Sequence, residues 1–84
     1  GEIDIVAKHD GYIVFVEVKY RSGVHKGMPE EAVDARKQRQ ICRTALFFLN
    51  RYGYGTDAPV RFDVISILGT EIHHIENAFE YSGY

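Results

Sequence analysis

The chain opens with two segments in which apolar and polar residues alternate, a pattern that predicts β-strands with one apolar face. They span residues 2–8 and 12–19 and are separated by Asp10-Gly11. An Asp-Gly pair favours a two-residue hairpin turn, because both central positions of a type I′ turn need positive φ. Such a turn pairs His9 with Tyr12, so the numbers of opposed residues sum to 21.

This register gathers charged side chains on one face of the hairpin. Asp4 lies opposite Glu17 and Glu2 lies opposite Lys19, and opposed residues point to the same face of a sheet. A four-residue loop keeps this arrangement, whereas a three-residue loop shifts it by one and moves Asp4 off the shared face. The opposite face receives only apolar residues, namely Ile3, Ile5, Ala7, Val14, Val16 and Val18.

A helix is predicted to begin after Asp34, which suits an N-cap, and to end at about residue 52, before Gly53. Its apolar stripe at helical spacing consists of Ile41, Cys42, Ala45, Phe48, Leu49 and Tyr52. The other predicted segments are a basic loop (21–28), a helical turn (29–32), a buried strand (60–68), a last strand (71–75) and a tail with exposed aromatic residues (78–84).

The order strand, strand, helix, strand, strand predicts an α/β fold. A strand followed by a helix and another strand usually forms a parallel pair, so we expect a mixed four-stranded sheet with at least one helix packed on it. A length of 84 residues indicates a single domain over residues 1–84. The lone cysteine, Cys42, excludes an internal disulfide and fits a cytoplasmic protein. No signal peptide or membrane span is predicted.

Charge is distributed unevenly along the chain. Residues 18–43 contain seven basic and three acidic residues, which gives +4 and leaves −6 for the rest of a chain whose net charge is −2. Local positive charge suits contacts with a phosphate backbone, so the overall acidity does not exclude nucleic acid. The alternative is a basic helix face that is simply solvated.

Directly opposed carboxylates repel each other unless a positive charge neutralises them. Lys19 supplies one such charge for Asp4 and Glu17, and a hard cation such as Mg²⁺, which takes one or two carboxylates and several waters, supplies the rest. The charges therefore predict a divalent-metal site, and the alternative is an edge hairpin with a solvated charged face. Gln38, in the first helical turn, either orients a water or contacts a phosphate, or lies at the edge of the packed face.

Other polar candidates have structural interpretations. Asp63 lies inside an apolar strand and needs a partner, for which Arg61 on the same face is the structural candidate. The alternative is that this pair supports the metal ligands from behind. His73 and His74 are adjacent on a strand and point to opposite faces, so we expect edge-strand histidines rather than one metal site. Cys42 belongs to the apolar stripe and is expected to be a small core residue.

The strings GEIDIVA, FVEVKYRS, PEEAVDARKQRQ and RFDVISI resemble the YraN-like family of uncharacterised bacterial proteins over nearly the whole chain. That family is similar to Holliday-junction resolvases and to the PD-(D/E)-x-K nuclease superfamily. The resemblance implies a restriction-endonuclease-like fold. It also implies that Asp4 and Glu17 are metal ligands, that the Val18 carbonyl completes the metal shell, and that Lys19 activates water or stabilises the phosphate. Gln38 falls where related nucleases place a helical Gln.

Two features depart from the family pattern. Ile3 stands where the superfamily name expects Pro, and the chain begins directly at the motif, without the N-terminal helix of the family. Either the protein was truncated or an upstream segment is missing from this chain. If the helix is absent, we expect one apolar face of the sheet to lack a cover, and such a patch favours a homodimer.

The sequence thus predicts a Mg²⁺- or Mn²⁺-dependent nuclease that hydrolyses DNA, with branched structures among the candidate substrates. Glu2 would be an auxiliary metal carboxylate, and the DNA backbone would be held by Arg21, Lys26, Arg36, Lys37 and Arg39. The first alternative is a non-catalytic nucleic-acid-binding or assembly module on the same fold. A further alternative is a protein-interaction domain that uses Phe79, Tyr81 and Tyr84.

Overall fold

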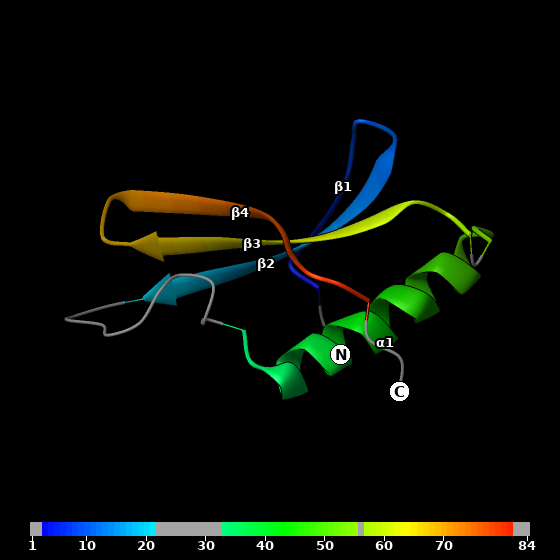
Figure 1. Cartoon of the computed structure of the whole chain (residues 1–84), viewed down its shortest axis with the longest axis horizontal. Helices are drawn as coiled ribbons and strands as arrows, with labels where there is room; N and C mark the ends of the chain where they lie inside the picture. Colours follow the sequence, from blue (N-terminus) through cyan, green and yellow to red (C-terminus); the bar gives the residue numbers. More distant parts are fainter. Residues whose placement is uncertain (1–2, 22–32, 56, 82–84) are drawn as a thin grey trace.

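The computed structural model describes residues 3–21, 33–55 and 57–81, which form four strands and one helix (Figure 1). In chain order these are β1 (Ile5–His9), β2 (Tyr12–Arg21), α1 (Ala35–Arg51), β3 (Val60–Leu68) and β4 (Glu71–Phe79). The predicted strand 60–68 and the helix have the expected bounds within one residue. The first strand begins later than predicted, at Ile5, and the second and last strands extend further.

The strands form one mixed sheet in the order β1-β2-β3-β4. β1 and β2 pair antiparallel, β2 and β3 pair parallel, and β3 and β4 pair antiparallel. α1 connects the two central strands, so the chain returns to the starting end of the sheet before β3 begins, which makes that pair parallel. The predicted α/β fold with a mixed four-stranded sheet is therefore confirmed.

The β1–β2 hairpin has the register expected from its turn. Ile5 pairs with Val16 and His9 pairs with Tyr12. Asp10 and Gly11 have φ values of 50° and 82°, the positive angles that a two-residue type I′ turn requires. This register fixes which side chains of the hairpin point to each face of the sheet.

α1 packs on only one of these faces, as Figure 1 shows. Asp34 caps the helix by accepting a hydrogen bond from the Lys37 backbone N–H at 2.9 Å, and Gly53 ends it with a φ of 79°. The helix buries Ile41, Cys42, Ala45 and Leu49 against Ile13, Phe15, Phe62 and Val64 of the sheet. Tyr52, by contrast, is 63% exposed, so its assignment to the buried stripe was wrong. It is the C-cap residue and lies beyond the last helical turn.

β4 extends to Phe79 because a bulge carries it past residue 75. Phe62 pairs with Phe79 and Val64 pairs with Ile75, so residues 76–78 lie opposite the single residue Asp63. The rings of Phe62 and Phe79 stack at 5.0 Å between centroids. Ala78 and Phe79 were predicted to belong to a loose tail, and this was wrong because the bulge hides their strand pairing.

The second face of the sheet carries no helix among the described residues. Val14 and Val16 on β2 are buried, whereas Ile5 and Ala7 on β1 are exposed. Within residues 3–21, 33–55 and 57–81, no helix is long and apolar enough to cross a membrane. The sheet therefore has one face under α1 and one open face among the described residues.

Candidate metal and nucleic-acid site

Asp4 and Glu17 meet at the end of the hairpin, on the face that α1 covers. Asp4 directly precedes β1, and the register that pairs Ile5 with Val16 places it opposite Glu17 when extended by one residue. Its Oδ2 atom accepts a hydrogen bond from the Val18 backbone N–H at 2.8 Å. Its carboxyl group also lies beside that of Glu17 and raises the Glu17 pKa. The two acidic residues predicted as metal ligands are thus in contact.

Two lysines face the same oxygen of Glu17. The Nζ atoms of Lys19 and Lys37 each lie 3.7 Å from Glu17 Oε2. The Glu17 side chain is only 8% exposed, whereas each lysine side chain is 36% exposed. Lys19 comes from β2, two residues from Glu17 on the same face, and Lys37 comes from the first turn of α1. Lys37, predicted to hold the DNA backbone, therefore also contacts the acidic pair.

The pKa of Glu17 is raised above 4.5, in the direction that burial and a neighbouring carboxylate demand. Burial is the largest cause, because a carboxylate loses hydration as it is covered. The Lys37 charge opposes this effect, the Asp4 carboxylate adds to it, and Lys19 opposes it. The two lysines thus do not fully compensate for burying this carboxylate beside another one.

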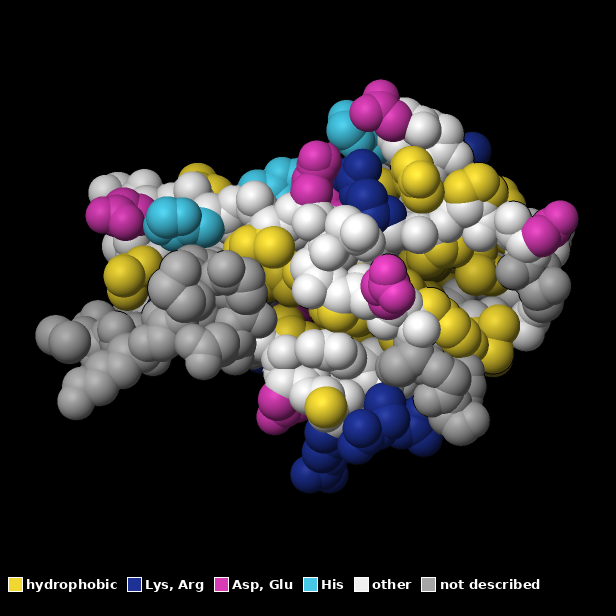
Figure 2. Space-filling view, viewed as in Figure 1, with side chains coloured by type: hydrophobic (Ala, Val, Ile, Leu, Met, Phe, Trp, Pro, Cys, Tyr) yellow, Lys and Arg dark blue, Asp and Glu magenta, His cyan; other side chains and the backbone are white. Residues whose placement is uncertain are grey.

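Positive charge surrounds the site on the α1 side. A pocket of about 290 Å³ is lined by Lys19, Asp34, Arg36, Lys37 and Gln40. Figure 2 shows Lys and Arg side chains gathered along the edge of the molecule beside α1. The helix contains five basic residues and no acidic ones between Ala35 and Arg51. The N-terminal end of the helix, from which Lys37 reaches Glu17, also carries a partial positive charge.

The remaining predicted site residues are placed as follows. The Gln38 side-chain Nε2 donates to the Val33 carbonyl at 3.1 Å, so its amide group stabilises the start of the helix. Arg36 and Arg39 are exposed on α1, and Arg21 is half-buried at the end of β2. Glu2 and Lys26 lie outside the described residues.

The donor set suits a hard divalent cation. Among the described residues there is no group of three or more His, Cys, Asp or Glu side chains, as a zinc site would need. Mg²⁺ usually takes only one or two carboxylates and keeps several waters, and Asp4 and Glu17 can provide such a pair. Because the N–H and C=O of one strand residue point to the same side, the Val18 carbonyl lies on the edge of β2 from which its N–H reaches Asp4. A cation bound between the two carboxylates would relieve their repulsion.

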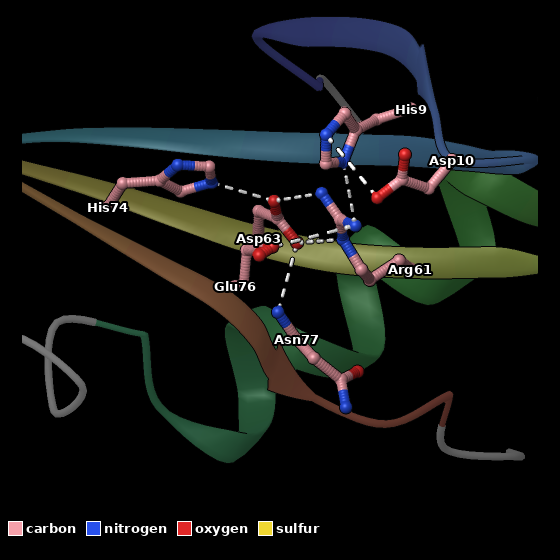
Figure 3. Close-up of polar contacts among 7 residues, drawn as sticks. All are labelled: His9, Asp10, Arg61, Asp63, His74, Glu76 and Asn77. Atoms are coloured by element: carbon pink, nitrogen blue, oxygen red, sulfur yellow. Dashed lines mark hydrogen bonds and ion pairs between the residues drawn. The ribbon is translucent and has the colours of Figure 1, made fainter.

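A second polar cluster lies on the open face of the sheet, around Asp63 (Figure 3). Asp63 is only 1% exposed and pairs in register with Val16, the residue before Glu17. Arg61 donates to both of its oxygens at 2.9 Å, through Nε and Nη2. His74 Nε2 lies 2.7 Å from Oδ2, and the Asn77 backbone N–H donates to Oδ1 at 3.0 Å.

These contacts make Asp63 a structural residue, as its place in an apolar strand predicted. Burial alone would raise the pKa of Asp63, but the hydrogen bonds from Arg61, Asn77 and His74 outweigh it and lower the pKa below its ordinary value. Arg61 also contacts His9 Nδ1 at 3.1 Å, so the cluster joins β3 and β4 to the tip of the hairpin. Arg61 was predicted as the partner and is confirmed. His74 and Asn77 were missed, because only the β3–β4 pairing brings them to Asp63.

Comparisons with known proteins give one consistent result. A family model described as "Uncharacterised protein family UPF0102" matches residues 1–67. A UPF0102 protein of Lachnoclostridium phytofermentans is 53% identical over 83 residues, which cover 99% of this chain and 70% of the relative. UPF0102 proteins of Geobacter metallireducens and Persephonella marina are 52% and 46% identical, each over 95% of this chain and 68% of the relative.

Proposed function

Since the chain belongs to the uncharacterised protein family UPF0102, we propose its activity from the site alone: a divalent-metal-dependent nuclease that hydrolyses phosphodiester bonds in DNA. The observation that carries the proposal is the contact of two carboxylates, Asp4 and Glu17, with a lysine 3.7 Å from the buried one. Two crowded carboxylates, one of them buried and with a raised pKa, are suited to holding a cation.

The metal would be held by the carboxylates of Asp4 and Glu17 and by the Val18 carbonyl, with Mg²⁺ or Mn²⁺ as the candidates. When bound, such an ion polarises a phosphoryl oxygen and lowers the pKa of a coordinated water. The Val18 N–H fixes the orientation of the Asp4 carboxylate, and burial beneath α1 fixes that of Glu17. Both ligands are thus preorganised, as a catalytic site requires.

Lys19 is the residue to which we assign the water-positioning or charge-stabilising role. Its ammonium group is partly exposed and lies beside Glu17, so it can orient a water next to the acidic pair or neutralise charge that develops on the phosphate. The basic surface of α1, with Arg36 and Arg39, would hold the DNA backbone without reading its sequence. In fold, a mixed sheet with an acidic hairpin and a crossover helix is compatible with the restriction-endonuclease-like class.

A cleavage assay tests the proposal. Single-stranded, duplex and four-way-junction DNA are incubated with the purified protein in Mg²⁺, Mn²⁺ or EDTA. We expect metal-dependent cutting that Asp4→Asn and Lys19→Ala each reduce by at least about 100-fold, the usual effect of removing one group that stabilises developing charge. DNA binding by the Lys19→Ala variant should stay within a few fold of that of the native protein. Native-like cleavage by this variant would refute the mechanism.

The second candidate is a nucleic-acid-binding or assembly module without catalysis. The observation that favours it is that Glu17 already has two lysine partners, so the formal charges of Glu17, Asp4 and the two lysines balance without a metal. This alternative predicts DNA binding that falls with salt but does not respond to EDTA or to Asp4→Asn. The same protein preparations distinguish the two candidates, because only the nuclease needs Asp4.

A further inference from the structure

Lys37 occupies a position that its place on a basic helix does not explain. Its ammonium group lies as close to Glu17 Oε2 as that of Lys19, 3.7 Å in both cases. Its backbone N–H is held by the Asp34 cap, so the start of its side chain is fixed at the first turn of α1. The other basic residues of that turn and the next, Arg36 and Arg39, are exposed.

The charges of this cluster balance before any metal binds. Asp4 and Glu17 contribute two negative charges, and Lys19 and Lys37 contribute two positive ones. Adding a divalent cation leaves the cluster with an excess of two positive charges and forces two ammonium groups close to that cation. Repulsion between the cation and the two ammonium groups beside Glu17 disfavours metal binding, even at a partly exposed site. Metal binding is therefore favoured when one lysine leaves Glu17.

Lys37 is better placed to leave than Lys19. Lys19 belongs to the same strand and face as Glu17, so its backbone keeps it beside that carboxylate, whereas Lys37 reaches Glu17 from a different element, the first turn of α1. Both lysines line the 290 Å³ pocket, together with Arg36, Gln40 and the helix-capping Asp34, next to the positive end of the helix. A Lys37 ammonium group that left Glu17 would thus remain in a pocket whose two other cations, Lys19 and Arg36, suit a phosphate oxygen.

We propose that Lys37 is a displaceable counter-ion: it neutralises Glu17 in the metal-free protein and, when a divalent cation takes over that role, contacts a phosphate of the nucleic acid. The inference rests on the proposed metal site and adds an order of events to it. Metal binding releases the lysine, and the released lysine strengthens the hold on the substrate. Lys37 is thus a positioning residue that links the two binding events.

The inference predicts that Lys37→Met strengthens the binding of Mn²⁺ and weakens that of DNA. In this variant no ammonium group from α1 competes with Mn²⁺ for Glu17, so the metal binds more tightly. We expect the Mn²⁺ affinity to rise by about tenfold, since the repulsion between one ammonium group and a nearby divalent cation changes the binding constant by about that factor even after solvent screening. With metal present, the same variant should bind DNA more weakly, because one phosphate contact is lost.

The first measurement is calorimetric titration of Mn²⁺ into the metal-free protein at pH 8, without nucleic acid. The native protein is compared with Lys37→Met, with the charge-conserving Lys37→Arg, and with Glu17→Gln. Arg43→Met is the matched control, because Arg43 is an exposed cation about 9 Å further along the same helix. Lys37→Arg and Arg43→Met should stay within about threefold of the native affinity, and Glu17→Gln should lose binding.

The second measurement is binding of a short duplex DNA, with Ca²⁺ in place of Mg²⁺ so that cleavage does not consume the probe. Lys37→Met should weaken binding by about tenfold at saturating Ca²⁺ and by less than about threefold in EDTA. An Mn²⁺ affinity that Lys37→Met leaves unchanged or weakens overturns the inference and leaves the proposed nuclease standing. Absence of Glu17-dependent Mn²⁺ binding in the native protein and in every variant overturns the metal site and the inference together.

Discussion

Replacing Asp63 by Asn tests whether the cluster on the open face of the sheet holds the β4 bulge in place. The carboxylate accepts four hydrogen bonds, two from Arg61 and one each from His74 and the Asn77 backbone. Asn has nearly the same shape but only one accepting oxygen. If that oxygen takes the Oδ1 position, the NH₂ group faces Arg61 Nη2, which cannot accept a hydrogen bond.

The cost follows from this count of contacts. His74 can adopt the tautomer that accepts from the new NH₂ group, so three contacts survive and one becomes a donor–donor clash. The variant also loses the negative charge opposite Arg61 while the site stays buried. Hydrogen bonds to charged groups are worth about 1.5–3 kcal/mol, and a buried group left unsatisfied costs about 1–3 kcal/mol. We therefore expect Asp63→Asn to lower the free energy of unfolding by about 3 kcal/mol, a large share of the stability of a small domain.

Urea unfolding followed by circular dichroism measures this loss. With a slope near 1 kcal/mol/M, about 3 kcal/mol lowers the urea midpoint by about 3 M. The effect should depend on pH in a defined direction. Because the folded-state pKa of Asp63 is lowered from 3.8, its stabilising contribution is complete above that pH and is lost as the pH falls towards the folded value. The difference between native protein and variant should therefore be constant near pH 7 and shrink below about pH 4.

Arg61→Met and the double variant complete a thermodynamic cycle. Because both residues belong to one cluster, the loss in the double variant should be smaller than the sum of the two single losses by more than about 1 kcal/mol. A loss below about 1 kcal/mol for Asp63→Asn, or simple additivity in the cycle, would refute the assignment of this cluster as the structural anchor of the bulge.

Two further predictions concern the acidic site and α1. Glu17→Gln should stabilise the metal-free protein at pH 7, because the raised folded-state pKa means that the ionised carboxylate costs stability; this gain should vanish below about pH 4.5. Urea unfolding at both pH values checks this, and a less stable variant at pH 7 would contradict it. Arg36→Met/Arg39→Met should reduce the slope of log K for DNA binding against log[salt] by about 1.8, since each phosphate contact contributes about 0.9. An unchanged slope in anisotropy titrations would show that this face of α1 does not hold DNA.

Local signals in the chain were sufficient for most of the fold. The Asp10-Gly11 turn determined the hairpin register, and with it the contact of Asp4 and Glu17. Asp34 and Gly53 marked the ends of the helix as predicted. The resemblance to the uncharacterised bacterial family is confirmed by the match over residues 1–67, whereas membership of the nuclease superfamily stays a prediction.

The errors came where periodicity gave no information about tertiary pairing. The last strand was predicted to stop at residue 75 because the bulge interrupts its alternation, and Asn77 there has a φ of 53° that no apolar pattern reveals. Tyr52 follows helical spacing but lies at the C-cap, where spacing alone cannot tell a buried position from an exposed one. The contact between Lys37 and Glu17 depends on how the crossover places α1 over the sheet, so the sequence showed only that Lys37 is basic.

Two buried carboxylates on neighbouring strands, Asp63 and Glu17, differ in how their charge affects the stability of the fold. Asp63 pairs with Val16, and Glu17 is the next residue along β2, so the two acids lie close in the sheet but on opposite faces. Asp63 is fully hydrogen-bonded and its pKa is lowered, which means that folding favours its charge. The pKa of Glu17 is raised despite two lysines, which means that folding tolerates its charge at a cost. The proposed divalent cation would relieve the cost of this charge beside a second carboxylate, so the raised pKa of Glu17 supports that proposal.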